Sequence, residues 1–158
     1  MASLVDTNIL VYRCDPRDPV KRQIADDLLR GSFAYDELLL PHQAIVEFIV
    51  AVTRRRSDLG GASLLPLAKA LLEAEEMMGQ FLVIYPNSAV LQTALRGTSI
   101  YQLSWLDAHL WAYAEVHGIP EILSEDFEHG RHYGNVRAVN PFLAAADSVH
   151  ELPPLYAD

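Results

Sequence analysis

The segment Ala2-Ser3-Leu4-Val5-Asp6-Thr7-Asn8 decides the fold class. Its apolar residues 2–5 form a short run that predicts a buried β-strand, and the polar residues 6–8 predict the loop or helix start that follows. A helical pattern comes next over residues 17–30, with Gly31 as its stop signal. A strand followed by a helix at the start of a chain is typical of an alternating strand–helix architecture.

The alternation continues along the chain. Short apolar runs predict further strands at residues 38–40, 81–85, 121–124 and 136–139. Helical spacing predicts helices at residues 42–56, 62–78, 87–95 and 104–117, the third of them stopping near Gly97. Because parallel strands need long crossovers, usually through helices, we expect an α/β fold with a single parallel β-sheet sandwiched by α-helices.

Length and composition indicate how many domains the chain forms and which classes of protein it fits. The 158 residues are 51% hydrophobic and 21% charged, which suits one globular domain, here predicted over residues 1–143. Residues 144–158 are poorly patterned and are expected to form a C-terminal extension of unknown role. Cys14 is the only cysteine, which excludes a disulfide framework and a cysteine-based zinc site and favours a reduced, cytoplasmic setting.

The charge and hydropathy pattern narrows the classes of partner. No apolar run approaches the ~20 residues of a membrane-spanning helix, and the N-terminus lacks the pattern of a secretory signal, so we expect no membrane association. The net charge is −9, from 12 basic and 21 acidic residues, which disfavours a sequence-independent coat on DNA. This charge leaves room for an enzyme that handles nucleic acid through a bound metal.

Two aspartates follow predicted strands. Asp6 ends the first strand, and Asp126 comes just after the strand that ends near Ser124. The carboxyl ends of parallel strands form the ligand crevice of such sheets, so both side chains are expected at the same rim if the strands are near neighbours. The alternative for each aspartate is ordinary turn chemistry or the N-cap of a helix.

Two further acids lie on predicted helices, beside apolar residues. Asp107 lies beside the apolar stripe of residues 104–117, and its alternative role is a capping box with Ser104. Glu47 is flanked by apolar residues in sequence and at helical spacing, which is costly for a buried carboxylate without a partner. Its alternative role is an ion pair, for example with the arginine run 54–56.

Four acids in one crevice repel one another unless a cation neutralises them. An all-oxygen set of ligands without cysteine favours a hard divalent ion, Mg²⁺ or Mn²⁺. Such ions activate water and bind phosphate oxygens, so the residues themselves favour a metal-dependent site that cleaves phosphodiesters.

Four motifs in order resemble those of the PIN-domain family. The first is Leu4-Val5-Asp6-Thr7-Asn8-Ile9-Leu10-Val11-Tyr12, and the second surrounds Glu47 in Gln43-Ala44-Ile45-Val46-Glu47-Phe48. The third is Leu103-Ser104-Trp105-Leu106-Asp107-Ala108-His109-Leu110, and the fourth is Ile122-Leu123-Ser124-Glu125-Asp126-Phe127, followed by Val139-Asn140-Pro141-Phe142. Each motif alone is short, but the four together at domain-like spacing are specific.

Within that family the chain is most similar to the VapC-like toxins of type II toxin–antitoxin pairs. The resemblance implies a three-layer fold, a Mg²⁺- or Mn²⁺-dependent endoribonuclease, a homodimer and inhibition by a cognate antitoxin protein. It also implies that Asp6, Glu47, Asp107 and Asp126 are the metal-binding and catalytic carboxylates. Thr7, Asn8 and Ser124 would have secondary roles, ordering those carboxylates or a metal-bound water.

The residues disfavour two other classes, and two alternatives within the PIN fold stay open. A haloacid-dehalogenase-like phosphatase needs a second acid two residues after the first, and here that residue is Asn8. A receiver domain needs a late lysine, whereas the only lysines are Lys21 and Lys69. A PIN-family nuclease that is not a toxin, or a catalytically inactive PIN-like interaction module, would keep the same fold.

Overall fold

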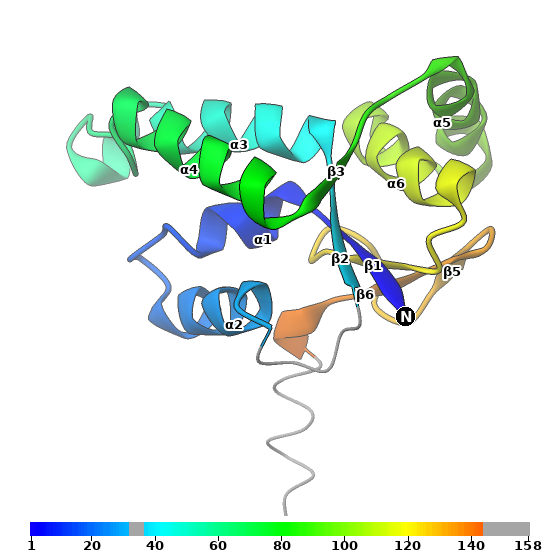
Figure 1. The fold of residues 1–158 in the computed structure, drawn as a ribbon, viewed down its shortest axis with the longest axis horizontal. Coiled ribbons are helices and arrows are strands. Elements are labelled where there is room, and N and C mark those ends of the chain that lie inside the picture. The colour runs from blue at the N-terminus through cyan, green and yellow to red at the C-terminus, as the bar shows by residue number, and fades with distance from the viewer. Residues whose placement is uncertain (32–36, 144–158) are drawn as a thin grey trace, which may run out of the picture.

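One six-stranded sheet organises the protein (Figure 1). The structure is a computed structural model that describes residues 1–31 and 37–143. The strands are β1 (Ala2–Val5), β2 (Glu37–Pro41), β3 (Leu82–Ile84), β4 (Glu121–Leu123), β5 (His132–Tyr133) and β6 (Val136–Val139). Their order is β3-β2-β1-β4-β6-β5, and every neighbouring pair is parallel except β5 with β6. The predicted α/β class is confirmed, and the short antiparallel strand β5 is an addition that the sequence pattern did not indicate.

Helices connect β1 to β2, β2 to β3 and β3 to β4, as crossovers between parallel strands require, whereas β4 leads to its parallel neighbour β6 through a loop and β5. The helices are α1 (Thr7–Tyr12), α2 (Pro19–Leu29), α3 (His42–Thr53), α4 (Leu67–Gln80), α5 (Ser88–Tyr101) and α6 (Trp105–His117), with a short 3₁₀ helix η1 (Ser57–Leu59) between α3 and α4. Side chains cap several of these helices: Asn87 accepts from the backbone of α5, and Ser104 from that of α6. Gly118, at φ 66°, ends α6 in the left-handed conformation.

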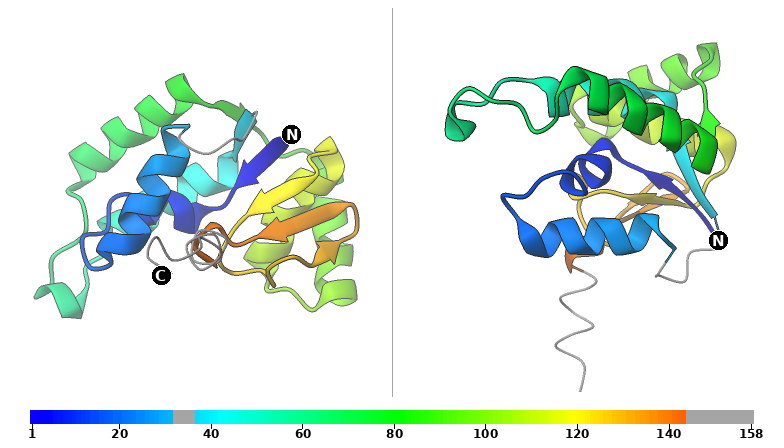
Figure 2. Two further views of the ribbon diagram at one scale, coloured as in Figure 1. Left: turned by 90° about the horizontal axis from the view of Figure 1, so that it is seen from below. Right: turned by 60° about the vertical axis from the view of Figure 1, so that its left-hand side comes forward.

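The alternation of side chains along each strand divides the core between the two faces of the sheet. Leu4 of β1 and Ile122 of β4 pack into the cluster that contains α5 and α6. Their neighbours Val5 and Leu123 pack into the cluster that contains α1, α2, α3 and α4. The result is three layers, with the sheet in the middle and helices on both faces (Figure 2).

Helix α5 differs from the prediction. It continues through Gly97 to Tyr101 and ends at Gln102, whose φ of 56° is left-handed, so the predicted stop near Gly97 was wrong. Gly97 is a packing residue here, because a Cβ at this position would overlap the indole ring of Trp111 in α6. The glycine therefore lets two helices approach closely, and it does not end the first of them.

The pairing of β1 with β4 sets the position of the candidate site. Val5 is in register with Leu123, and the backbone N–H of Asp6 donates a 3.0 Å hydrogen bond to the carbonyl of Leu123. The segments that follow β1 and β4 therefore leave the sheet side by side at its carboxyl end, as predicted for Asp6 and Asp126.

Two predictions concern the C-terminal extension and membrane-spanning helices. The predicted C-terminal extension, residues 144–158, lies outside the described residues. Among the helices of residues 1–31 and 37–143, none is long and apolar enough to cross a membrane.

Candidate active site

A cavity of about 440 Å³ lies at the carboxyl ends of β1 and β4. The four predicted carboxylates all line it, together with two of the predicted secondary residues: Asp6, Glu47, Asp107, Asp126, Thr7 and Asn8. They come from the end of β1, from α1, from α3, from α6 and from the segment after β4. The third secondary residue, Ser124, is fully buried and contacts Asp6 from behind the cavity wall.

Asp6 is the most buried of the four acids, with 4% of its surface exposed. Its carboxylate caps α1, where Oδ1 accepts a 2.5 Å hydrogen bond from the backbone N–H of Thr7. Its Oδ2 accepts a hydrogen bond from the hydroxyl of Ser124. Burial nevertheless raises the pKa of Asp6 to about 7, and repulsion from Asp126 adds to the effect of burial. Asp6 is thus both the N-cap of α1 and part of the cavity lining.

The amide of Asn8 lies between the two strand-end aspartates. Its Nδ2 is 3.2 Å from Oδ2 of Asp6, 3.1 Å from Oδ2 of Asp126 and 3.3 Å from Oγ of Ser124. The Oδ1 of Asn8 is buried and has no hydrogen-bond partner in the described structure. Such an unsatisfied acceptor is rare in a folded protein, and a bound water or cation would satisfy it.

Glu47 is held by neutral donors. The hydroxyl of Thr7 donates a 2.7 Å hydrogen bond to Oε2 of Glu47, which links α1 to α3. Glu47 does not form the ion pair considered as its alternative role, since it has no salt bridge in the part of the chain that the structure describes. Within the predicted arginine run, Arg56 instead donates to the carbonyl of Ala51 near the end of α3.

Asp107 takes part in the cap of α6 and also lines the cavity. Its backbone N–H donates a 3.3 Å hydrogen bond to Oγ of Ser104, so the capping interaction at the start of α6 is present. Its half-buried carboxylate also lines the cavity. Burial raises the pKa of Asp107, and repulsion from Asp126 and Glu47 adds to the effect.

The donor chemistry of the cavity fits a hard divalent cation. Four carboxylates line it, and none of these acids has an ion-pair partner among the described residues. Oxygen ligands of this kind suit Mg²⁺ or Mn²⁺, which keep several waters when bound. Among residues 1–31 and 37–143, no three acidic, histidine or cysteine side chains converge closely enough to form a complete metal site by themselves. The fit therefore rests on the chemistry of the donors.

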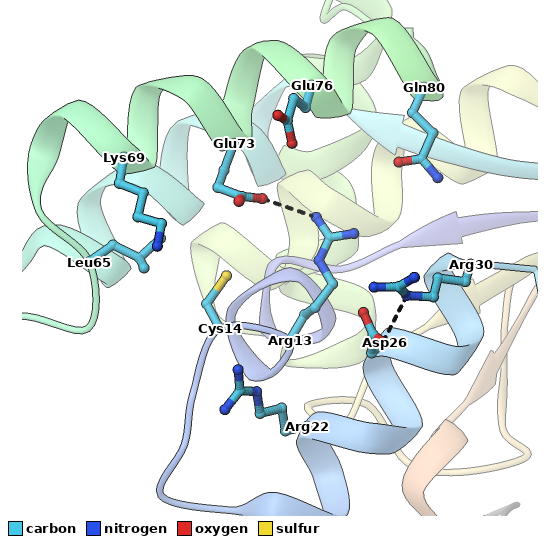
Figure 3. A pocket seen from close by; sticks show the side chains of 10 residues that line it. All are labelled: Arg13, Cys14, Arg22, Asp26, Arg30, Leu65, Lys69, Glu73, Glu76 and Gln80. Carbon is cyan, nitrogen blue, oxygen red and sulfur yellow. Dashed lines mark hydrogen bonds and ion pairs between the residues drawn. The ribbon is translucent and has the colours of Figure 1, made fainter.

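A second cavity has a different charge pattern. It measures about 460 Å³ and lies between the end of α1, α2 and α4 (Figure 3). Two ion pairs lie in it: Arg13 is 3.7 Å from Glu73, and Arg30 is 2.8 Å from Asp26. Four basic residues line this cavity against three acids, whereas the four predicted carboxylates of the first cavity have no ion-pair partner among the described residues.

The sequence matches the family model for the PIN domain over residues 3–135, which is most of the chain. The chain belongs to the PIN-domain family. The match includes all four carboxylates of the cavity and the residues of β1 and β4 that carry two of them. The predicted family is thereby confirmed.

Solved structures share the fold of this PIN domain at low sequence identity. One is Mycobacterium tuberculosis VapC20, described as a sarcin-ricin loop cleaving toxin, with 15% identity, 80% of this chain and 89% of that chain covered, and a TM-score of 0.60. A toxin–antitoxin complex from Klebsiella pneumoniae has 18% identity, 88% and 97% coverage, and a TM-score of 0.59. VapBC2 from Rickettsia felis, bound to a DNA fragment from its promoter, has 10% identity, 87% and 97% coverage, and a TM-score of 0.60. No curated protein matches the sequence.

The cavity of this PIN domain includes residues that the sequence did not indicate. Glu125 lines it, and its carboxylate accepts hydrogen bonds from the hydroxyl of Tyr12 (2.6 Å) and from Nζ of Lys21 (2.8 Å). Lys21 also lies 5.2 Å from the ring centroid of Phe142, so the cluster joins α1, α2, the segment after β4 and the end of the domain. These residues are far apart in the sequence and follow no common spacing, so no pattern signals their contact.

Proposed function

We propose that this PIN domain is a divalent-metal-dependent endoribonuclease, the toxin of a toxin–antitoxin pair. One observation carries the proposal: four carboxylates without cationic partners line one cavity at the carboxyl edge of the sheet. Burial and mutual repulsion raise the pKa of Asp6 and of Asp107, which is the effect expected where negative charge carries an energetic cost. A bound cation would relieve that cost.

The residues divide into two proposed roles. Asp6, Glu47, Asp107 and Asp126 would hold Mg²⁺ or Mn²⁺, which when bound acts as a Lewis acid and lowers the pKa of a coordinated water. Thr7, Asn8 and Ser124 would orient the carboxylates, through the hydrogen bonds to Glu47, to Asp126 and to Asp6 described above. Because a metal-coordinated water would supply the nucleophile, no side chain needs to act as one.

The choice of RNA as substrate rests on the family and on the structural relatives. Among those relatives, Mycobacterium tuberculosis VapC20 is described as cleaving the sarcin-ricin loop. This chain shares its fold and places its acids on one cavity, which supports the same class of phosphodiester substrate. We expect the reaction to be hydrolysis of RNA within the strand, carried out in the cytoplasm.

A cognate antitoxin and a homodimer are proposed as protein partners. The relatives from Klebsiella pneumoniae and Rickettsia felis are toxin–antitoxin assemblies. This chain leaves many large apolar side chains exposed on its helices, namely Val46 and Val50 of α3, Leu67, Leu71 and Leu72 of α4, and Leu91, Leu95 and Ile100 of α5. Apolar surface of this extent supports burial against protein partners.

The test is RNA cleavage by the purified protein. We expect cleavage of a mixed structured RNA in Mg²⁺ or Mn²⁺, and none with EDTA. Asp107→Asn and Asp126→Asn should abolish cleavage while the thermal unfolding profile stays cooperative. Asp27→Asn is the matched control, since Asp27 accepts a hydrogen bond from Gln23 on α2, outside the cavity.

Other results would favour the alternatives. Metal-dependent cleavage together with normal growth of cells that express the protein would support a PIN-family nuclease that is not a toxin. A folded protein that neither cleaves RNA nor gains thermal stability with Mg²⁺ or Mn²⁺ would support an inactive PIN-like interaction module, and the enzyme proposal would be abandoned.

A further inference from the structure

A buried amide, that of Gln43, joins α3 to α6 beside the cavity. Gln43 lies in the first turn of α3, one helical turn before Glu47, and only 8% of its surface is exposed. Its Nε2 lies 2.9 Å from the carbonyl oxygen of Leu106 and 3.5 Å from Oε1 of Glu47. Its Oε1 lies 2.5 Å from Nδ1 of His109. Gln43 does not line the cavity, so it contacts the site only through other residues.

The partners of this amide fix its orientation. A backbone carbonyl oxygen can only accept a hydrogen bond, so the Gln43 atom beside Leu106 must be the NH₂ group. The second hydrogen of the same group points toward Glu47, whose carboxylate also only accepts. The remaining atom, Oε1, therefore faces His109 and needs a donor there.

His109 supplies that donor in one tautomer only. A neutral imidazole carries a single N–H, and the bond to Gln43 requires it at Nδ1. The ring is also held by an edge contact with Tyr113, at 5.3 Å between centroids, and by a tilted contact with Trp105, at 5.9 Å.

We propose that Gln43 is a positioning residue that holds Glu47 and the start of α6, with Asp107, in one relative arrangement, and that His109 fixes the amide of Gln43. The inference rests on the proposed function, because it assigns a task to a side chain that acts through two of the proposed metal ligands. One amide spans both helices, since it bonds the Glu47 carboxylate and the carbonyl of Leu106, the residue before Asp107. Thr7 holds the other oxygen of Glu47, so both oxygens of this carboxylate are oriented by uncharged donors.

The first test is the tautomer of His109 and requires no enzyme assay. Imidazole ¹⁵N spectra of the metal-free protein should show His109 protonated at Nδ1. In Gln43→Met, which keeps the length of the side chain but removes its polar atoms, the ring should shift toward the Nε2–H form that free imidazole side chains prefer. A wild-type ring protonated at Nε2 would overturn the proposal.

The second test is metal affinity. Outer partners of metal ligands contribute about 10- to 100-fold to affinity, so Gln43→Met should raise the half-saturating Mn²⁺ concentration for RNA cleavage by about that factor. Cleavage at saturating Mn²⁺ should recover most of the wild-type rate. Gln80→Met is the matched control, because Gln80 also donates to a backbone carbonyl, that of Leu29, far from the carboxylates. Equal Mn²⁺ dependence in Gln43→Met and Gln80→Met would reduce Gln43 to a structural role.

A second pair of variants covers the case in which Gln43→Met fails to fold. His109→Asn keeps an N–H near the position of Nδ1, whereas His109→Leu removes it, and both lose the contacts of the ring. We expect His109→Asn to require less Mn²⁺ than His109→Leu by several-fold, and equal requirements would overturn the proposal. The wild-type protein separates a failure of this inference from a failure of the proposed function. If the wild type shows no Mn²⁺-dependent cleavage, the proposed function fails, whereas the tautomer of His109 still reports on Gln43.

Discussion

The hydroxyl of Ser124 donates a hydrogen bond to Oδ2 of Asp6, a residue 118 positions earlier in the chain. The parallel pairing of β1 with β4 brings the two together, because Val5 and Leu123 are in register immediately before them. The same Oγ accepts a 3.0 Å hydrogen bond from the backbone N–H of Asp126. A single buried hydroxyl therefore connects both strand-end aspartates of the candidate site without adding positive charge.

Ser124→Ala should lower both stability and metal affinity. The substitution leaves the buried Asp6 carboxylate without its hydroxyl donor and the Asp126 N–H without its acceptor, which costs about 1–3 kcal/mol in the free energy of unfolding. It should also raise the pKa of Asp6 further, since the Ser124 bond lowers that pKa at present. Urea unfolding with EDTA measures the first effect, and a Mn²⁺ titration followed by thermal unfolding measures the second.

Ser63→Ala is the control for Ser124→Ala. Ser63 donates a 2.7 Å hydrogen bond to the carbonyl of Leu65, in the loop before α4 and away from the acids. The Ser63→Ala variant should lose stability without any change in its Mn²⁺ response. A Ser124→Ala protein with wild-type Mn²⁺ response would show that Ser124 does not act on the carboxylates.

The stability of the metal-free protein should fall as the pH rises from about 4 to about 7. Asp6 has a pKa of about 7 in the folded chain and an ordinary value of 3.8 when unfolded, so the folded state binds more protons between these values. Linkage then makes folding less favourable with increasing pH, and the loss is complete above the folded pKa. About three pKa units correspond to an upper limit of about 4 kcal/mol.

Asp6→Asn isolates this contribution. The variant lacks the titrating group, so its urea midpoint with EDTA should decrease less between pH 5 and pH 8 than that of the wild type. Mn²⁺ should stabilise the wild type more at pH 8 than at pH 5, because the ion binds the deprotonated carboxylate. Parallel pH profiles for the two metal-free proteins would contradict the raised pKa of Asp6.

Gly97→Ala should destabilise the protein, even though alanine is the better helix former. Gly97 lies within α5, and an added Cβ would come within 2.8 Å of Cε3 of Trp111, inside the contact distance of carbon atoms. Overpacking of a core typically costs about 1–3 kcal/mol. The matched substitution Gly79→Ala in α4 meets no atom within 4 Å, so it should stabilise by about 0.4–1 kcal/mol. Thermal unfolding of both variants checks the pair, and two changes of the same sign would contradict the packing role of Gly97.

Tyr12→Phe should destabilise the protein by about 1–3 kcal/mol, the range for hydrogen bonds to charged groups. The phenol donates to Glu125 at 2.6 Å and accepts from Lys21 at 3.2 Å, and phenylalanine retains the ring but neither bond. Tyr85→Phe is the control, since 55% of the surface of Tyr85 is exposed. If urea unfolding gives the same midpoint for both variants, the cluster around Glu125 does not stabilise the fold.

Sequence patterns predicted the parts of this protein that depend on local periodicity. The strands and helices follow from apolar spacing, and Asp6 and Asp126 follow from their places after two strands of a parallel sheet. Glu47 could be predicted as a candidate site residue because a carboxylate flanked by apolar residues on a helix is costly to bury without a partner. Gln43 on the same helix gave no such signal, because an uncharged polar residue in a first helical turn is ordinary.

The features that were missed depend on contacts between distant segments. Lys21 meets Glu125 only because α2 packs near the end of β4, and no spacing in the sequence encodes that approach. The predicted stop at Gly97 failed for a similar reason, since the role of this glycine is set by Trp111 in the next helix. Strand β5 has two residues, too few for any periodicity to show.

The position of β4 beside β1 has a consequence for the order of synthesis. Asp6, Glu47 and Asp107 all leave the ribosome before residues 121–126, which supply the strand next to β1, the Ser124 hydroxyl and the last carboxylate. A nascent chain that stops short of β4 cannot close the cavity. For a protein proposed to cut RNA, any activity that needs all four carboxylates is therefore expected only when the domain is nearly complete.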